Sequence, residues 1–208
     1  MMGLSVQEAS LKIKDQPFAV SGPVLVTHWG LSGPAVLKLS SHTARLLAGL
    51  NYRFTLSLNW TGEMNEEQVR GEFSRMKSGF PAKQVQNHPL CSLPRRLWQY
   101  LAAKSGIDEQ LQWANVSKEQ LRSLVMALVR DEYPVEGKTT FKEEFVTCGG
   151  VSLPEIDLKT MESKKVKGLF FAGEVLDIDA VTGGFNFQAA WSGGFVAGTA
   201  MASVFSKL

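Results

Sequence analysis

The sequence predicts an α+β protein of more than one domain, because three different patterns follow one another along its 208 residues. Residues 4–60 are mostly strand-like, and residues 62–132 repeat apolar residues at helical spacing. From residue 147 a turn-rich stretch leads into a strand, a glycine-rich loop and a long helix. With 44% hydrophobic residues, the chain can bury one or two cores, so we expect a folded protein.

The first part predicts a small barrel or sheet. Three segments rich in β-branched and aromatic residues, each broken by Gly, Pro or Asn, read as strands: LSVQEASLKI, PFAVSGPVLVTHWG and NYRFTLSLNW. Between the second and third of them we expect a helix, with Ser32 at its N-cap, Gly33 and Pro34 in its first turn, and Gly49 after its end.

The middle part predicts three helices: NEEQVRGEFSRMKS, LPRRLWQYLAAKSG and SKEQLRSLVMALVRDEY. Asn65, Ser92 and Ser117 are candidate caps, and Ser117 with Gln120 has the spacing of a capping box. Strand character returns in GKTTFKEEFVTCGGVSL, so the helices read as an insertion into the barrel, which this strand closes.

Composition narrows the class of protein. The formal charge of +2 permits RNA as a partner without indicating it. Cys91 and Cys148 form no metal or disulfide pattern, and His42 and His88 have no ligand at metal spacing, so no metal is predicted. There is no secretory leader and no membrane-length apolar run, which predicts a cytoplasmic protein without a membrane partner. The chain opens directly in a strand pattern, which suggests a fragment.

The segment from Gly168 to Ala202 is the most informative part of the sequence. The apolar strand Leu169–Ala172 is expected to end at Gly173 and Glu174, where a carboxylate can accept hydrogen bonds from a ribityl hydroxyl. Thr182, Gly183 and Gly184 then open a helix whose free N–H groups favour negative charge, which suits a reduced flavin.

The small residues of this last helix need a close packing partner, since each interior glycine costs about 1 kcal/mol of helix stability. They include Ala189, Ala190, Gly193, Gly194, Ala197 and Gly198. A tightly packed helix in an unrelated α/β core is the alternative interpretation of the glycines alone.

Three spaced motifs resemble the BaiN/YhiN-like NAD(P)/FAD-dependent oxidoreductases, also called the aminoacetone oxidase family: AGEVLDIDAVTGGFNFQAAWSGGFVAG, VTCGGVSLPEIDLKTMESKKVKGLFF and VLVTHWGLSGPAVLKLSS. The resemblance runs over nearly the whole chain in family order. It implies a β-barrel insert domain at 1–61 and 134–146, with an inserted small helical domain at 62–133. It further implies that residues 147–208 are the C-terminal segment of a glutathione-reductase-like FAD-binding α/β domain.

The resemblance also implies where the cofactor lies. Gly173 and Glu174 would lie along the ribityl and pyrophosphate region, while the isoalloxazine ring would be approached by Thr147, Gly149, Gly150, Gly184, Phe185 and Asn186. The GxGxxG loop that opens such enzymes is not in this sequence. We therefore expect FAD in an intact protein, which supplies the missing N-terminal half, and weak or no FAD binding by this chain alone. NAD(P)H is a candidate electron donor.

Several single residues allow a chemical or a structural role. His28 is a candidate proton relay, or simply a loop histidine that caps a turn. Asp177 is a candidate cofactor ligand or helix cap. Cys148 is a candidate redox partner, although a small buried residue is the simpler reading. Arg95 and Arg96 next to aromatic residues suggest an RNA face, but a core stripe of Leu97, Trp98 and Leu101 with solvated arginines explains the pattern more simply.

The function that we predict is part of a flavin-dependent oxidoreductase that transfers a hydride between a nicotinamide or substrate and FAD. We favour reduction of a conjugated double bond in a small molecule, such as a steroid-like enone, or in a nucleobase. The alternative is a non-catalytic folded fragment or binding module that cannot hold FAD by itself.

Overall fold

The computed structural model describes residues 2–138, 146–181 and 183–205. The chain divides into two compact units. The first unit combines Met1–Leu39 with Gly49–Gly137, and the second combines Ser40–Ala48 with Lys138–Leu208.

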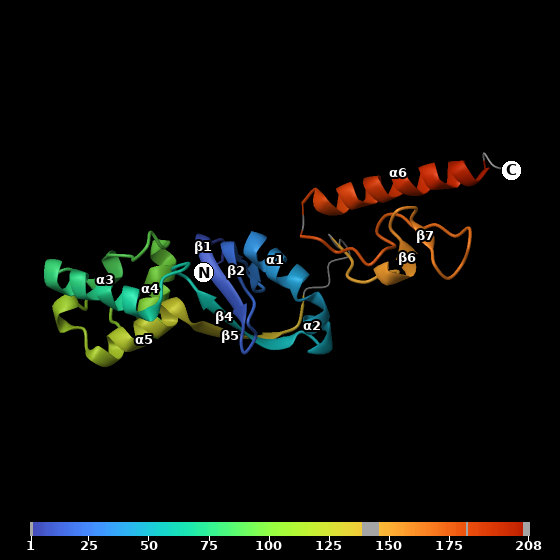
Figure 1. Cartoon of the computed structure of the whole chain (residues 1–208). Helices are drawn as coiled ribbons and strands as arrows, with labels where there is room; N and C mark the ends of the chain where they lie inside the picture. The colour runs from blue at the N-terminus through green and yellow to red at the C-terminus, as the bar shows by residue number, and fades with distance from the viewer. Residues whose placement is uncertain (1, 139–145, 182, 206–208) are drawn as a thin grey trace. The chain divides into compact units, whose positions relative to one another are not determined.

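An antiparallel five-stranded sheet is the centre of the first unit (Figure 1). Its order is β3-β2-β1-β4-β5, with β1 at Ser5–Ile13, β2 at Ala19–Val26, β3 at Leu31–Ser32, β4 at Arg53–Asn59 and β5 at Asp131–Glu136. The side chains of Val6, Ala9, Leu11 and Ile13 are buried, and a register shift between Val6 and Ala9 keeps this face inward. The three strands expected before residue 61 are confirmed, and the sheet curls as a half-barrel.

The expectation that the third helix runs through Tyr133 is wrong, because residues 131–136 form strand β5. The helix ends at Val129, and Asp131–Glu136 instead pairs along β4, with Pro134 opposite Thr55. A proline is tolerated there because β5 lies at the edge of the described sheet. Most of the closing strand expected from GKTTFKEEF lies outside the described residues, so closure of the barrel stays a prediction.

The helix expected between the second and third strands is present in two pieces, α1 (Pro34–His42) and α2 (Ala44–Gly49). Ser32 is not its cap, because Ser32 pairs with Leu25 in the sheet. The backbone carbonyl of Gly33 accepts the first helical hydrogen bond instead, from the N–H of Leu37 at 3.0 Å. Gly33 has φ +103°, and a Cβ there would lie 2.9 Å from the carbonyl oxygen of Pro23, so only glycine fits this turn.

The helical subdomain contains α3 (Glu66–Gly79), η1 (Val85–Asn87), α4 (Arg95–Lys104), η2 (Trp113–Asn115) and α5 (Lys118–Val129). The expected capping box of Ser117 with Gln120 forms, and the expected cap Asn65 forms a second capping box with Gln68. Ser92 is not a cap, because α4 begins after Pro94 without a side-chain cap. The core stripe on α4 is confirmed, since Leu97, Trp98 and Leu101 are fully buried while Arg95 and Arg96 are exposed.

A buried carboxylate joins the helical subdomain to the sheet. Asp131, at the start of β5, is 2% exposed and accepts hydrogen bonds from Trp60 Nε1 at 2.9 Å and Tyr133 OH at 2.5 Å. Its other oxygen lies 2.6 Å from Nζ of Lys104, the last residue of α4. Burial, followed by this hydrogen bond, raises the pKa of Tyr133. The three contacts tie β4, β5 and α4 together at one point.

The second unit contains η3 (Leu153–Glu155), β6 (Ile156–Asp157), β7 (Glu162–Ser163) and α6 (Phe185–Phe205), and α6 runs alongside the segment that carries β6 and β7 (Figure 1). Its core is formed by Ile156, Met161, Leu176 and Ala197. Part of the small-residue face packs as expected, because a Cβ on Gly193 would lie 3.3 Å from Met161 and 3.7 Å from Ala172. None of the described helices is long and apolar enough to cross a membrane.

The buried strand expected at Leu169–Ala172 is not formed. Phe170 makes one isolated bridge to Glu162, and Leu169 is 41% exposed. A buried strand needs a neighbour on each side, and the described residues supply only this short contact on one side. The glutathione-reductase-like arrangement of this unit therefore stays a prediction.

Candidate functional site

Two glycine-containing segments of the second unit lie side by side and form the base of the candidate site. The N–H of Val151 donates to the carbonyl of Val175 at 2.8 Å, and the N–H of Asp177 donates to the carbonyl of Val151 at 3.0 Å. This parallel contact places the predicted residue Gly150 alongside the segment that contains Gly173, Glu174 and Asp177. Thr147 and Gly149 precede the contact, and Thr147 is exposed.

Gly150 is required by this packing. A Cβ on Gly150 would lie 2.5 Å from the carbonyl carbon of Leu176 and 2.6 Å from the oxygen of Val175, and its φ is +157°. The backbone of the neighbouring segment therefore occupies the place of a side chain. This explains the glycine without any cofactor, and the expected approach of Gly150 to a flavin ring stays a prediction.

Gly149 and Gly173 face open space. Their φ angles are +107° and +84°, and a Cβ on either would meet no atom within 4 Å. Gly173 begins a tight turn, because its carbonyl accepts from the N–H of Leu176 at 3.2 Å. The turn presents Glu174 at the surface, where no partner for its carboxylate is found among the described residues. Its oxygens remain available to accept hydrogen bonds from a ligand hydroxyl.

Arg45 is a site residue that sequence reasoning missed. Its Nη2 lies 2.6 and 2.7 Å from the two carboxylate oxygens of Asp177, and this contact raises the pKa of Arg45. The two residues are 132 positions apart, so no local pattern could have paired them. Asp177 therefore acts first as a tether for α2, and its predicted contact with a cofactor stays untested.

Cys148 lies in the same cluster. A hydrogen bond to Asp179 and burial raise the pKa of its thiol, and this effect outweighs the opposite effect of Arg45. The thiol form is therefore favoured, which does not suit a nucleophilic thiolate. The structure agrees with the simpler reading of Cys148 as a small, half-buried residue.

The N-terminal end of α6 is held by an asparagine clamp. Asn186 accepts from the N–H of Ala180 at 2.9 Å and donates to the carbonyl of the same residue at 3.1 Å. Gly183 has φ +148°, which favours glycine, and Phe185 is 67% exposed. Thr182 lies outside the described residues. The clamp positions the loop, so the amide of Asn186 is already engaged.

Gly184 is a predicted site residue whose glycine the described contacts do not explain. It has no left-handed φ, and a Cβ there would meet nothing within 4 Å. Neither backbone conformation nor packing among the described residues therefore requires glycine. It immediately precedes a 21-residue helix, whose first N–H groups lack intrahelical partners. The expected approach of Gly184 to a flavin ring stays a prediction.

The other candidates lie outside this segment. His28 is exposed on the β2–β3 hairpin in the first unit. Its ring packs edge-on against the ring of Trp29, with the two centroids 4.0 Å apart. The turn itself is held by Thr27, whose N–H and hydroxyl both donate to the carbonyl of Gly30. Nδ1 of His88 lies 3.2 Å from the carbonyl oxygen of Gln84. Across the described ranges no three potential metal ligands gather.

Comparison with known proteins places the chain in a family. Residues 1–146 match the family model of the HI0933-like protein barrel and H2TH domain. The chain belongs to the HI0933-like family. This confirms the resemblance to BaiN/YhiN-like proteins that the three motifs indicate.

The HI0933-like chain is similar to three curated bacterial proteins. It is 34% identical over 172 residues to the ribosomal RNA dihydrouridine synthase of Haemophilus influenzae, covering 83% of this chain and 40% of that protein. It is 35% identical over 170 residues to the protein of the same name from Escherichia coli, covering 81% of this chain and 40% of that protein. It is 30% identical over 183 residues to the 3-dehydro-bile acid delta(4,6)-reductase of Clostridium scindens, covering 88% of this chain and 44% of that protein. The chain therefore spans about two fifths of the length of these relatives.

Proposed function

We propose that this chain forms the insert and the flavin-facing C-terminal segment of an FAD-dependent oxidoreductase that reduces a carbon–carbon double bond in a nucleobase of RNA. The observation that carries the flavin part is Gly184, a glycine in open space at the start of α6 that no described contact requires. The family membership and the names of the relatives support the reaction class.

The relatives share one kind of chemistry. A dihydrouridine synthase and a delta(4,6)-reductase are both named for adding hydrogen to a ring double bond. We choose the nucleobase over the steroid because the two ribosomal RNA enzymes are 34% and 35% identical to this chain, against 30% for the bile acid enzyme. Because ribosomal RNA is found in the cytoplasm, we propose that the protein is cytoplasmic.

The residues of the second unit have defined tasks in this proposal. FAD, when bound, supplies the hydride, and NAD(P)H is the proposed donor that recharges it. The first N–H groups of α6, next to Gly184, stabilise negative charge at the ring edge. Glu174 accepts hydrogen bonds from ribityl hydroxyls, and Phe185 excludes water from the ring. The Arg45–Asp177 pair holds the segment between Glu174 and α6 in place.

The exposed side of α6 supports a role within a longer protein. Phe187, Trp191 and Phe195 follow one another at four-residue spacing, and their exposed fractions are 64%, 69% and 77%. The opposite side already packs through Gly193 and Ala197. A helix that is apolar all round is normally buried, so we infer that a flavin-binding sheet covers this stripe.

A titration of the chain with FAD, followed by flavin fluorescence, tests whether the proposed flavin site needs protein beyond these 208 residues. The full-length Escherichia coli relative serves as the positive control. We expect no saturable binding by the 208-residue chain, because the described residues supply only part of the proposed site. Tight binding by the chain alone would refute the proposed need for further protein.

Substitution of Gly184 in an intact family enzyme that carries this segment tests the flavin placement. Gly184→Val puts a branched side chain where we place the ring, so flavin should be lost on gel filtration, and with it the formation of dihydrouridine in ribosomal RNA. Gly79→Val, in the exposed last turn of α3, makes the same chemical change away from the site and should retain flavin. Retention of flavin by Gly184→Val would contradict the placement.

A further inference from the structure

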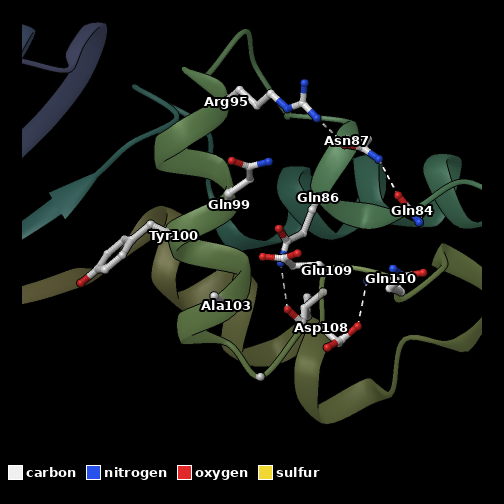
Figure 2. Close-up of a pocket in the computed structure, with 12 residues that line it drawn as sticks. Gln84, Gln86, Asn87, Arg95, Gln99, Tyr100, Ala103, Asp108, Glu109 and Gln110 are labelled. Carbon is white, nitrogen blue, oxygen red and sulfur yellow. Dashed lines mark hydrogen bonds between the residues drawn. The ribbon is translucent and has the colours of Figure 1, made fainter.

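The helical subdomain contains a polar pocket that the proposed flavin site does not use. It has a volume of about 760 Å³, within the range of about 300–1,000 Å³ typical of ligand pockets. Figure 2 shows that η1 and α4 supply one side and the Asp108–Gln110 turn another. Five amide side chains line it: Gln84, Gln86, Asn87, Gln99 and Gln110.

Internal hydrogen bonds orient these amides. Arg95 Nη2 donates to Asn87 Oδ1 at 2.7 Å, and Asn87 Nδ2 donates to Gln84 Oε1 at 2.6 Å, as the dashed lines in Figure 2 show. Gln86 is 6% exposed and donates through Nε2 to the carbonyl of Ile107 at 3.2 Å. This leaves Gln86 Oε1, Gln84 Nε2 and both ends of Gln99 without a partner among the described residues.

Such a set of oriented donors and acceptors matches the edge of a nucleobase. Gln and Asn amides read bases by paired donor and acceptor contacts, and carboxylates accept hydrogen bonds from exocyclic amino groups. Asp108 and Glu109 line the pocket and are exposed, so they favour a base that carries an amino group and disfavour a phosphate on their side.

The pocket receives Arg95 from a basic stretch of the sequence. Between Phe73 and Ile107 the sequence has six basic residues and no acidic one: Arg75, Lys77, Lys83, Arg95, Arg96 and Lys104. Arg95 lines the pocket, and Arg96 and Lys83 are exposed without an ion-pair partner among the described residues. Guanidinium and ammonium groups in this place suit the phosphates next to a bound base.

An aromatic pair lies next to Gln84, which lines the pocket. Phe80 and His88 stack with centroids 6.1 Å apart, and His88 Nδ1 lies 3.2 Å from the carbonyl oxygen of Gln84. Phe80 is 49% exposed, so part of its ring is accessible to a partner. Exposed rings next to cations are the features on which unpaired bases stack. Tyr100 is not such a platform, because Figure 2 shows its ring pointing away from the other labelled side chains.

From these observations we propose that the pocket binds an unpaired, amino-bearing nucleotide of single-stranded RNA, separate from the base that is reduced. The inference rests on the proposed function for its choice of RNA as substrate. It assigns a recognition role to the helical subdomain, with Gln99 and Gln86 reading the base, Arg95 contacting the backbone and Phe80 stacking a neighbouring base.

Fluorescence anisotropy of labelled single-stranded oligoadenylate, oligocytidylate and oligouridylate tests this with the 208-residue chain. We expect the adenylate and cytidylate oligomers to bind more tightly than oligouridylate. Gln99→Ala should weaken binding by about 5-fold or more, and Arg95→Glu should lower the slope of log affinity against log salt by about 1 or more. Arg122→Glu on α5 makes the same charge change at an exposed residue that does not line the pocket, and it should have a smaller effect.

The outcomes separate the pocket from the reaction. Wild-type affinity in Gln99→Ala, or an equal loss in Arg95→Glu and Arg122→Glu, would overturn the pocket, as would absence of RNA binding by the chain. Thermal melting of each variant verifies the fold, and Gln99 is only half-buried, so its loss should not unfold the subdomain. The assay needs neither flavin nor turnover. If the pocket binds RNA selectively but the intact protein makes no dihydrouridine, the proposed reaction is refuted and the pocket proposal stands.

Discussion

Asp131 is the residue whose replacement should most clearly separate a tertiary contact from local structure. Asp131→Asn keeps the size of the side chain and removes its charge. The native carboxylate accepts from Trp60, Lys104 and Tyr133, and it is 2% exposed. An amide offers one acceptor oxygen, and its NH₂ group would face either the Lys104 ammonium or the Trp60 and Tyr133 donors, so at least one donor loses its partner.

The expected cost follows from these contacts. Removing one partner of a buried ion pair typically costs about 3–5 kcal/mol, and leaving a buried donor unsatisfied costs about 1–3 kcal/mol. The side chain of Lys104 is 41% exposed and can turn towards water, which lowers the ionic part of the loss. We therefore expect a decrease of about 3 kcal/mol in the free energy of unfolding of the first unit.

Urea unfolding followed by tryptophan fluorescence measures this change, because Trp60, Trp98 and Trp113 are all buried in the first unit. With a slope of about 2 kcal/mol/M, the midpoint should fall by about 1.5 M. Glu132→Gln is the matched control, since the neighbouring carboxylate forms only an exposed pair with Lys14 and should change stability by less than about 0.5 kcal/mol. A decrease below about 1 kcal/mol in Asp131→Asn would refute the assigned role.

Two further predictions concern Tyr133 and Gly150. Because the folded pKa of Tyr133 is raised above its ordinary value, the stability that it contributes is present below about pH 10 and declines as the pH rises further. Tyr133→Phe should therefore leave the tyrosinate absorbance that the folded protein gains near pH 10 unchanged. A smaller absorbance gain in the variant would contradict the raised pKa of Tyr133. Gly150→Ala should cost more than about 2 kcal/mol, because the new Cβ meets the backbone of Leu176. In Gly150→Ala we expect faster amide exchange at Val151 and Asp177, because their two segments separate. Unchanged protection of these amides would contradict the predicted cost.

Predictions from the sequence succeeded where the structure depends on near neighbours. The expected capping box joins Ser117 and Gln120, three positions apart, and the buried stripe of α4 is a repeat within one helix. The strands before residue 61 show their inward and outward alternation in the sequence itself. The glycine-rich start of α6 was located correctly, with the helix beginning at Phe185.

Failures occurred where a distant partner decides the conformation. The segment DEYPVE contains three acidic residues and a proline, and it becomes strand β5 only because β4 offers a row of backbone partners. The apolar segment Leu169–Ala172 does not become a strand, because it makes only one short bridge among the described residues. Intrinsic strand propensity spans only about 1 kcal/mol, so the presence or absence of a strand partner decides both conformations.

By itself the sequence determined the family, the order of the strand-rich, helical and glycine-rich parts, and most helix starts, because these depend on spacing along the chain. Tertiary structure alone decided that Arg45 holds Asp177, that Asp131 joins the sheet to the helices, and that Gly150 serves backbone packing while Gly184 faces open space. The physical reason is that each of these properties depends on atoms brought together by folding from distant or independently oriented segments.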